Sequence, residues 1–437
     1  MNLVSHPAED GSPARSWDLS TLATARSIID EFKRQMDLGL AADRSGSLAM
    51  IRTFIPKTAR FHPGTYVGLD LSGTNFRVVV LSVDPDQSLA GSPRIRVFPI
   101  PSKLKGGEAG HQVHSRDLFR FLAGGIARTL EEEEVAASGL RVGFTFAFPT
   151  RMESADRGVL LKWTKEWDLP DLVGRDPVPE LARACREAGL QGVKVNVLLN
   201  DTVGTLILGY FQDRRTLAGG ILGTGTNLAA WLGSTAINFE CGNFDFGPLR
   251  NRVLTPVDRD LDSRSRNPGQ QRFEKMVAGR YLGGLLRRLL AGIHPLGSFG
   301  ERGAVGAEDL SHLAADAGGL PETRRFLERS GVVDNGLEQR RQAVSLARMI
   351  LRRSAQLSAL AMIATAEWAD PELEDDHVMT VDGSLFEHAP GYPEAMRRMF
   401  RNVLGSRAER IECRLVKDGS GIGAALASSA VEARADD

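Results

Sequence analysis

A short polar turn in the first quarter of the chain carries residue types that suit phosphate binding. Residues 70–75 (DLSGTN) offer small side chains, a hydroxyl, an amide and exposed backbone N–H groups, which together form a nest for phosphate oxygens. Arg77 adds positive charge close by, and Asp70 adds a carboxylate that can face a metal. The candidate nucleotide contacts are Asp70, Gly73, Thr74, Asn75 and Arg77. The same residues also suit a plain β-hairpin turn, so both interpretations stay open here.

A second turn, residues 223–227 (GTGTN), has the same chemistry and repeats the Gly-Thr-Asn of residues 73–75. Both copies lie between apolar runs. The repetition indicates a duplicated unit that cradles a nucleotide, with a chance match as the alternative. Thr224 is the candidate nucleotide contact in this turn. No GxxxxGK[ST] sequence occurs, which disfavours a P-loop NTPase.

A glycine-rich turn near the C-terminus, residues 419–424 (GSGIGA), fits the loose GxGxxG/A pattern. A Rossmann unit needs a second strand with an acidic residue about 20 positions further on, and too few residues follow Ala424 to supply one. A glycine-rich turn that opens a helix still presents N–H groups to an anion. We therefore predict a nucleotide contact without a Rossmann domain, made by Asp418, Gly419, Ser420 and Gly421.

Single acidic residues elsewhere are ambiguous when each is taken alone. Asp201 lies where a strand ends and a helix is expected to begin, so it is either an N-cap or a base that accepts the proton of an attacking hydroxyl. Phosphoryl transfer asks little more of a protein than positioning, charge neutralisation and such a carboxylate. Glu240 and Glu274 would pass as solvated surface residues, and the Trp-Thr-Lys of residues 163–165 is a weak signal.

The hydrophobic periodicity predicts an α/β arrangement around these residues. Apolar spacing of about 3.6 predicts helices, and short β-rich runs between turn residues predict strands. The expected helices are 19–38, 118–134, 203–211, a largely buried 342–368, and one that starts at Ala424. The expected strands are 66–71, 76–83, 142–148, 193–199, two within 219–232, and 411–416. Residues 101–114 are expected to form an exposed loop, and 291–323 a loop with short helices.

The composition excludes several classes of protein. The chain has 437 residues, enough for two or three domains, and its 54 Lys and Arg against 55 Asp and Glu argue against nucleic acid or an anionic membrane as the main partner. Its three cysteines lie far apart and show no metal-ligand spacing. No signal peptide and no apolar run of about 18 residues is visible, so we expect a cytoplasmic protein.

Taken together, the candidate segments resemble the hexokinase family, the glucokinase-like ATP-dependent sugar kinases. The motifs, in order, are YVGLDLSGTNFRVVVLSV at 66–83, GFTFAFP at 143–149 with LKWTK at 161–165, NDTVGTL at 200–206, GTGTN at 223–227, NPGQQRFEKMVAGRYLG at 267–283, VDGS at 381–384 and DGSGIGAA at 418–425. The resemblance covers residues 20 to 431, roughly. Each motif occurs once, so the chain resembles a single catalytic unit.

The resemblance implies the two-domain actin-like ATPase fold, which is ribonuclease H-like, with ATP and sugar in an interdomain cleft. It implies a small domain of residues 64–199 with a C-terminal helix 424–437, a large domain of 17–63 and 200–423, and a loose leader of 1–16. It implies Asp201 as general base, with Lys165 beside it in catalysis. The implied sugar contacts are Thr164, Lys165, Asn200, Asp201, Asn227, Glu240 and Glu274. Magnesium would enter with ATP rather than occupy a site of its own, with Asp70 facing it through water.

Four positions depart from the family pattern. Ser72 replaces a glycine in the first phosphate turn and fits there if its φ stays negative. Ala147 replaces a serine and removes one sugar hydrogen bond, while Glu166 replaces a glycine and Cys241 replaces a tryptophan. The last three lie on the sugar side, so they bear on which sugar binds and how tightly.

Two other functions compete with an ATP-dependent hexose kinase. A catalytically weak sugar-binding sensor on the same fold would account for the four substitutions. An actin-like ATPase without a sugar substrate would share the phosphate turns, but it would not need the Trp-Thr-Lys, NDTVGT and NPGQQ-FEK segments. The retained Asp201, Lys165, Glu240 and Glu274 favour the kinase.

Overall fold

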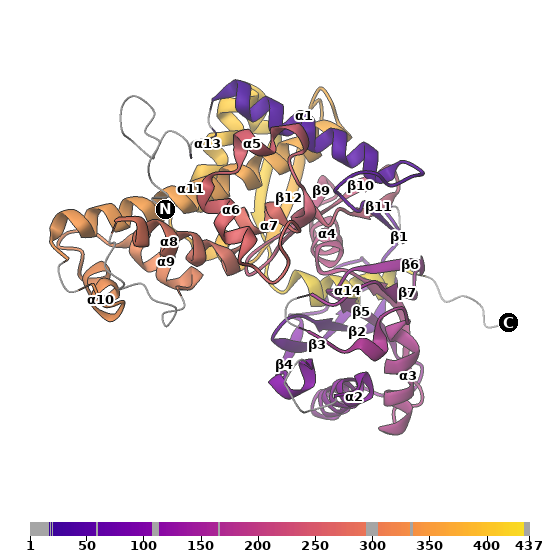
Figure 1. Ribbon diagram of the computed structural model, residues 1–437. Helices are drawn as coiled ribbons and strands as arrows, with labels where there is room; N and C mark the ends of the chain where they lie inside the picture. Colours follow the sequence, from indigo (N-terminus) through magenta and orange to yellow (C-terminus); the bar gives the residue numbers. More distant parts are fainter. Residues whose placement is uncertain are drawn as a thin grey trace.

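Two β-sheets organise the computed structural model, which describes residues 21–57, 60–106, 113–164, 167–293, 305–332 and 335–431 together with Trp17 and Leu19 (Figure 1). The helices are α1 (Leu22–Leu40), α2 (Ser115–Glu132), α3 (Pro177–Glu187), α4 (Asp201–Gln212), α5 (Arg250–Val253), α6 (Pro256–Ser263), α7 (Arg272–Val277), α8 (Gly279–Ile293), α9 (Ala307–Ala315), α10 (Pro321–Arg329), α11 (Leu337–Ala369), α12 (Ser384–His388), α13 (Tyr392–Leu404) and α14 (Gly419–Ala430). Of the helices described, none combines the length and the apolar character that crossing a bilayer requires.

The smaller sheet has the order β4-β3-β2-β5-β8. Its strands are β2 (Gly64–Leu71), β3 (Asn75–Val83), β4 (Arg94–Pro99), β5 (Arg141–Phe146) and β8 (Lys194–Leu199). Strands β2, β3 and β4 form an antiparallel meander, and β5 and β8 continue parallel to β2. A separate hairpin, β6 (Thr150–Ser154) and β7 (Arg157–Leu160), follows β5.

The larger sheet repeats this topology and adds one strand. Its order is β1-β11-β10-β9-β12-β13, built from β1 (Ile51–Pro56), β9 (Thr216–Leu222), β10 (Thr226–Leu232), β11 (Thr235–Asn238), β12 (His377–Asp382) and β13 (Ile411–Leu415). Strands β9, β10 and β11 are antiparallel, and β12 and β13 run parallel to β9. The repeated Gly-Thr-Asn segments join the first hairpin of each sheet, so the predicted duplication is present in the topology.

Two helices lie between the sheets. The last strand of each sheet leads into a helix, β8 into α4 and β13 into α14, and these two helices pack against each other between the sheets (Figure 1). The contact is close: a Cβ atom at Gly423 would lie 1.9 Å from the carbonyl oxygen of Gly204. Only glycine allows that separation, so the glycine-rich start of α14 serves packing as well as turning.

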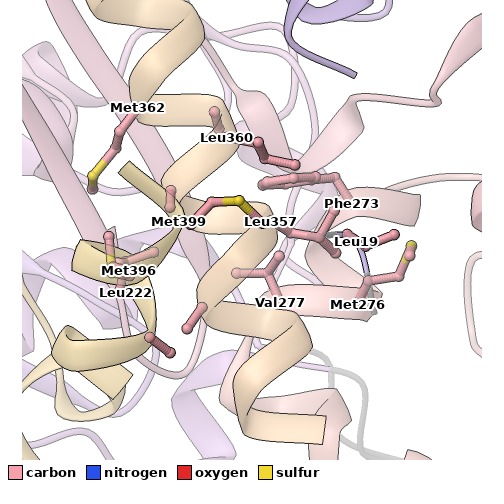
Figure 2. Close-up of a cluster of buried hydrophobic side chains, with 14 of the residues drawn as sticks. Leu19, Leu222, Phe273, Met276, Val277, Leu357, Leu360, Met362, Met396 and Met399 are labelled. Carbon is pink, nitrogen blue, oxygen red and sulfur yellow. The ribbon is translucent and has the colours of Figure 1, made fainter. Parts of the chain in front are cut away.

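Helix α11 forms the centre of the larger core. Its C-terminal part, residues 353–367, is buried without interruption. Figure 2 shows Leu357 and Leu360 of this helix among Phe273 and Val277 of α7 and Met399 of α13. The predicted burial is confirmed for this part, whereas Arg341, Ser345, Arg348 and Arg352 of the N-terminal part are exposed.

Most predicted elements are confirmed, with boundary shifts of a few residues. The exception is the last helix, which was expected from Ala424 and begins at Gly419. The expected loop 101–114 contains a short 3₁₀ helix (Ser102–Lys105), and residues 107–112 of it lie outside the described part of the chain. The predicted leader, residues 1–16, also lies outside that part.

Candidate active site

The first turn of α4 carries the predicted general base. Strand β8 ends at Leu199, Asn200 caps the helix, and Asp201 is its first residue. The Asn200 side chain accepts hydrogen bonds from the N–H and the hydroxyl of Thr202, at 3.0 and 2.7 Å. Oδ1 of Asp201 accepts from the same N–H, at 2.9 Å. Asn200 therefore serves as the cap, and Asp201 holds a half-buried carboxylate at the positively polarised end of α4.

A chain of side-chain amides leads from this helix start to a second carboxylate. Nδ2 of Asn227 on β10 lies 3.4 Å from Oδ1 of Asn200 and donates to Oδ1 of Asn238 at 2.8 Å. Nδ2 of Asn238, at the end of β11, donates in turn to Oε1 of Glu240 at 3.0 Å. Each amide in this chain has a fixed orientation, so its remaining donors and acceptors are preorganised for a polar ligand.

The two predicted sugar-binding glutamates both lie close to Cys241. Glu240 has a left-handed backbone, with φ of 52°, directly after β11. Glu274 lies on α7, where its Oε2 accepts from Nε2 of Gln271 at 3.1 Å. A Cβ atom at Gly242 would lie 2.8 Å from Oε2 of Glu274, so the glycine leaves room for this carboxylate. Both glutamates are close enough to Cys241 to raise the pKa of its thiol.

The thiol of Cys241 is held in its protonated form. The residue is fully buried, and burial first, then Glu240 and Glu274, raise its pKa well above the ordinary value. Burial also raises the pKa of Cys185 to about 11 and that of Cys413 to about 12. All three cysteines are free, and none has the low pKa that a reactive thiol requires.

The segment with the predicted Trp-Thr-Lys contacts is described only in part. Lys165 and Glu166 lie outside the described residues. Thr164, on the loop after β7, is half-buried, and its carbonyl accepts from the N–H of Trp167 at 3.1 Å. Among the described residues, Thr164 therefore belongs to its own loop rather than to the amide chain that starts at Asn200.

Aromatic packing fixes that loop beside the first phosphate turn. Trp163 packs edge-on against Phe148, with ring centroids 4.6 Å apart, and stacks on Trp167 at 5.5 Å. Nε1 of Trp167 donates to the carbonyl of Gly73 at 3.3 Å. The structure thereby joins the predicted sugar loop to the predicted nucleotide turn, which no spacing in the sequence shows.

A narrow cavity of about 20 Å³ lies between the two sheets next to Asn200. Its lining includes Ile51, Thr53 and Asn238 from the larger sheet, and Phe146, Phe148 and Leu199 from the smaller sheet or the residues just after it. Ala147 lies between the two phenylalanines, and its N–H donates to the carbonyl of Leu71 at 3.3 Å. A serine hydroxyl at position 147 would therefore lie at the boundary between the sheets.

On the nucleotide side, Asp70 and Arg77 form an ion pair across the β2–β3 hairpin. Asp70 is 2% exposed, and its Oδ2 accepts from Nη1 of Arg77 at 3.1 Å and from the hydroxyl of Ser420 at 2.8 Å. Arg77 also approaches Oδ1 of Asp418, with its Nε at 3.6 Å. The structure thus brings together four of the predicted nucleotide contacts, from segments about 340 residues apart in the sequence.

Asp382, the last residue of β12, lies close to Asp70 and Asp418. Its Oδ2 accepts from the N–H of Gly419, the first residue of α14, at 2.8 Å. Burial, with smaller contributions from Asp418 and Asp70, raises the pKa of Asp382 to about 6. The N–H of Gly419 is therefore engaged by a protein carboxyl group, and the predicted nucleotide contact at this residue would have to share it.

The two predicted phosphate turns have different surroundings. In the first, the N–H and hydroxyl of Ser72 both donate to the carbonyl of Asn75, at 3.2 Å each, and Thr74 is exposed. Ser72 is not among the described residues with a left-handed backbone, so it fits without the glycine of the family pattern. In the second turn Thr224 is exposed, and its carbonyl accepts from the N–H of Arg280 at 3.3 Å.

The donor set at this corner suits a magnesium ion that arrives on a nucleotide. Asp70, Asp382 and Asp418 lie close enough that the first and third raise the pKa of the second. Magnesium keeps several waters and is commonly held by one or two carboxylates plus substrate phosphates. Within the described residues, no three potential ligands of the His, Cys, Asp and Glu types converge on one point. The water-mediated contact expected of Asp70 stays a prediction.

Four site residues were not predicted as contacts from the sequence. They are Asn238 in the amide chain, Asp382 at the start of α14, Gln271 beside Glu274, and Trp167 on Gly73. Asn238 had no usable signal, because β11 ends at this residue and Glu240 has a left-handed backbone, so strand periodicity does not link the two. Asp382 lies within the VDGS motif and Gln271 within the NPGQQRFEKMVAGRYLG motif, but neither was predicted as a contact.

Two family models, both described as hexokinase, match this chain over residues 18–211 and 217–430. Hexokinase-7 of Oryza sativa subsp. japonica is 33% identical over 434 residues, which span 91% of each chain. Hexokinase-1 of the same organism is 35% identical over 444 residues, spanning 92% of this chain and 86% of the relative.

Solved structures give the same result. A hexokinase from Schistosoma mansoni complexed with glucose is 27% identical, with a TM-score of 0.82 over 96% of this chain and 97% of the other. A second hexokinase crystal structure is 28% identical, with a TM-score of 0.76 and 96% of each chain covered.

Proposed function

This chain belongs to the hexokinase family, and we propose on that basis that it transfers the γ-phosphoryl group of Mg-ATP to the 6-hydroxyl of glucose or a related hexose, with Asp201 as general base. Family membership makes it an ATP-dependent hexose kinase. The structural match likewise confirms the predicted fold class, the two-domain actin-like ATPase fold.

One observation carries the proposal for the site. The amide chain of Asn200, Asn227 and Asn238 runs from the residue next to Asp201 to Glu240. A hexose is a ring of hydroxyl groups, and each carboxylate or amide can make two or more hydrogen bonds with it. A site of this kind rejects sugars that lack or invert a hydroxyl, because a buried polar group is then left unpaired.

The proposed sugar contacts would surround the ring from both halves of the molecule. Asn200, Asp201, Asn227, Glu240 and Glu274 would come from the larger half, where the hydrogen bonds above orient most of them. Thr164 and Lys165 would come from the loop of the smaller half, which Trp163 packs against Phe148. Closure of one half on the other would exclude water, which competes with the sugar as phosphoryl acceptor.

In the proposed reaction Asp201 accepts the proton of the 6-hydroxyl as its oxygen bonds to the γ-phosphorus. The bond from that phosphorus to the β–γ bridging oxygen breaks at the same time, and ADP leaves with the bonding pair. The carboxylate must be ionised to accept the proton, and the N-terminal end of α4 favours its negative charge. Lys165 is proposed to balance the charge that moves onto the transferred group.

The proposed nucleotide contacts are the two turns and the start of α14. Gly73, Thr74, Asn75 and Thr224 would offer N–H groups and hydroxyls to the phosphates, while Arg77 would offer its guanidinium. Asp418, Ser420 and Gly421 would bind at the first turn of α14, with Gly419 sharing its N–H with Asp382. Bound magnesium supplies charge neutralisation on the phosphates, and Asp70 would hold its water shell.

The domain division and the location are part of this proposal. A small domain of residues 64–199 with the C-terminal helix, and a large domain of 17–63 and 200–423, would place the boundary inside α14. Helix α14 packs on α4 as well as on β2 and β5, so it contacts both halves of this division. A cytoplasmic location fits the three free cysteines, since disulfides are rare in that compartment.

Replacing the proposed base separates catalysis from binding. Asp201→Ala is expected to lower turnover by about a hundredfold or more while sugar binding, followed by tryptophan fluorescence, changes only slightly. Asp30→Ala, which removes an exposed carboxylate on α1, is the matched control. Turnover of Asp201→Ala within about tenfold of the parent would remove Asp201 from the base role. Sugar binding without turnover in the parent itself would favour the sugar-binding sensor instead.

A further inference from the structure

A large pocket lies away from the proposed active site, between the N-terminal part of α11 and the residues that join α9 to α10. Figure 1 shows where these three helices lie in the molecule. Its volume is about 880 Å³, within the range of pockets that hold small-molecule ligands. None of the residues proposed above for sugar or nucleotide lines it. Its lining combines apolar residues with three arginines: Trp17, Leu320, Val344, Arg341, Arg348 and Arg352.

The three arginines lie on one face of α11. Positions 341, 348 and 352 are separated by seven and four residues, the spacings at which side chains of an α-helix share a face. At about 1.5 Å of rise per residue, this face is about 16 Å long, enough for several negatively charged groups. All three side chains are exposed along it.

No carboxylate of the described residues neutralises these arginines in an ion pair. Arg348 is held by backbone carbonyls instead: its Nε donates to Ala314 at 2.8 Å and its Nη2 to Asp316 at 3.1 Å. Arg341 and Arg352 have no ion pair with any described residue. Three positive charges on one wall of a pocket create a local field that attracts anions, although the whole chain has a formal charge of -1.

The acidic group that lines the pocket is already engaged. Oδ2 of Asp316 accepts from both the N–H and the hydroxyl of Thr323, each at 2.7 Å, and Oδ1 accepts from the N–H of Ala317 at 3.1 Å. The carboxylate therefore caps α10 and is 7% exposed. Against this one carboxylate, the three guanidinium groups leave the pocket lining with an excess of positive charge.

The floor of the pocket is apolar and firmly held. Trp17 is 4% exposed, and its ring lies 4.4 Å from the guanidinium carbon of Arg353. Arg353 is itself buried and makes two hydrogen bonds to Asp258, at 2.9 and 2.8 Å. A ligand that enters would meet both buried apolar groups and exposed guanidinium groups.

We propose that this pocket binds a small phosphorylated molecule, one with at least two negative charges and an apolar or aromatic portion. Arginine suits this chemistry because its planar fork bonds two phosphate oxygens at once, whether the phosphate belongs to a nucleotide or to a sugar phosphate. The site is additional to the catalytic one, and it does not depend on which hexose is phosphorylated.

The test compares ligand stoichiometry in the full chain and in variants of the pocket. Calorimetric titration of the parent with ATP, and separately with pyrophosphate and glucose 6-phosphate, is expected to show a second binding event for at least one probe. Arg341→Gln combined with Arg352→Gln should weaken that event by about tenfold or more while the other event and kcat stay unchanged. These two arginines make no hydrogen bond with a described residue, so the double variant should keep its fold.

Charge loss at a neighbouring surface is the control. Arg324→Gln with Arg325→Gln removes two exposed arginines of α10 that pair with Glu328 and Glu322, and it should leave both binding events intact. Equal weakening in the two double variants, or a single binding event for every probe in the parent, would overturn the proposal. Binding that appears only after removal of residues 1–16 would also overturn it, because the pocket would then hold the chain's own N-terminal segment.

Discussion

Ala147 is the residue at which one added oxygen should change sugar affinity. It is 3% exposed and lies between Phe146 and Phe148, which line the cavity next to Asn200. Ala147→Ser is expected to lower the KM for glucose about two- to tenfold, the effect of one added hydrogen bond, with little change in kcat. Steady-state kinetics beside Ala127→Ser on α2 provide the check. An unchanged or higher KM would mean that the pocket is shaped around the alanine.

Asn238 is the residue through which the amide chain reaches Glu240. Asn238→Asp keeps an oxygen for Nδ2 of Asn227 but places a carboxylate where Nδ2 now donates to Glu240 at 3.0 Å. Two facing carboxylates repel, and protonation of one of them restores a donor. The KM for sugar should therefore rise most at high pH and recover partly as the pH falls toward 5, relative to the parent. A KM ratio that is constant with pH would contradict this role.

Residue types and motif order named the candidate site residues, whose roles stay predictions, but not the hydrogen bonds among them. The structure places Asp201 at the start of α4, Asn227 on β10, Glu240 two residues after β11 and Glu274 on α7. The pairing of β10 with β11, which sets Ala229 opposite Asn238, is what brings Asn238 to Asn227. A contact of this kind depends on the register of the two strands, and one sequence alone predicts strand register only weakly.

Among the elements, α14 shows how tertiary contacts override local preference. Its first residues, Gly-Ser-Gly-Ile-Gly, predicted a turn because glycine disfavours helix interiors. They are helical because their lack of a side chain lets α14 pack closely: a Cβ atom at Gly423 would lie 1.9 Å from the carbonyl oxygen of Gly204, and one at Gly421 would lie 2.8 Å from Cγ2 of Val79. The cost of helical glycines is offset by contact of α14 with both the smaller sheet and α4.

Asp382 gives the start of α14 a pH-dependent stability. Its pKa of about 6 in the folded chain exceeds the ordinary value of 3.8, so between these pH values the folded chain holds a proton that the unfolded chain has released. The stability contributed by this proton is complete below pH 4 and is lost as the pH rises through about 6.

Asp382→Asn removes this titration and keeps an oxygen that accepts from Gly419. Its free energy of unfolding, measured against that of the parent, should gain on the order of 1–3 kcal/mol between pH 4.5 and pH 7.5. Denaturant unfolding at both pH values, with the exposed Asp375→Asn as control, provides the measurement. Parallel stability curves for parent and Asp382→Asn would show that the carboxyl group titrates normally.

At the scale of the molecule, the two sheets repeat one topology. Both sheets carry the same antiparallel hairpin with a Gly-Thr-Asn segment, and both continue into parallel strands that end in the paired helices α4 and α14. Motif order and the repeated segment were enough to predict the fold class. Trp167 joins the sugar loop to the first phosphate turn, and three arginines of α11 line a pocket. Both features arise from packing between segments distant in the sequence, and hydrophobic periodicity does not predict such packing.

The most direct measurement is sugar-dependent release of ADP from Mg-ATP across glucose, mannose, fructose, glucosamine and N-acetylglucosamine, with Asp201→Ala in parallel. The rate is expected to depend on the presence and the stereochemistry of the sugar and to be lost in Asp201→Ala. ADP release at the same rate with and without sugar, or equal rates in the parent and Asp201→Ala, would contradict it.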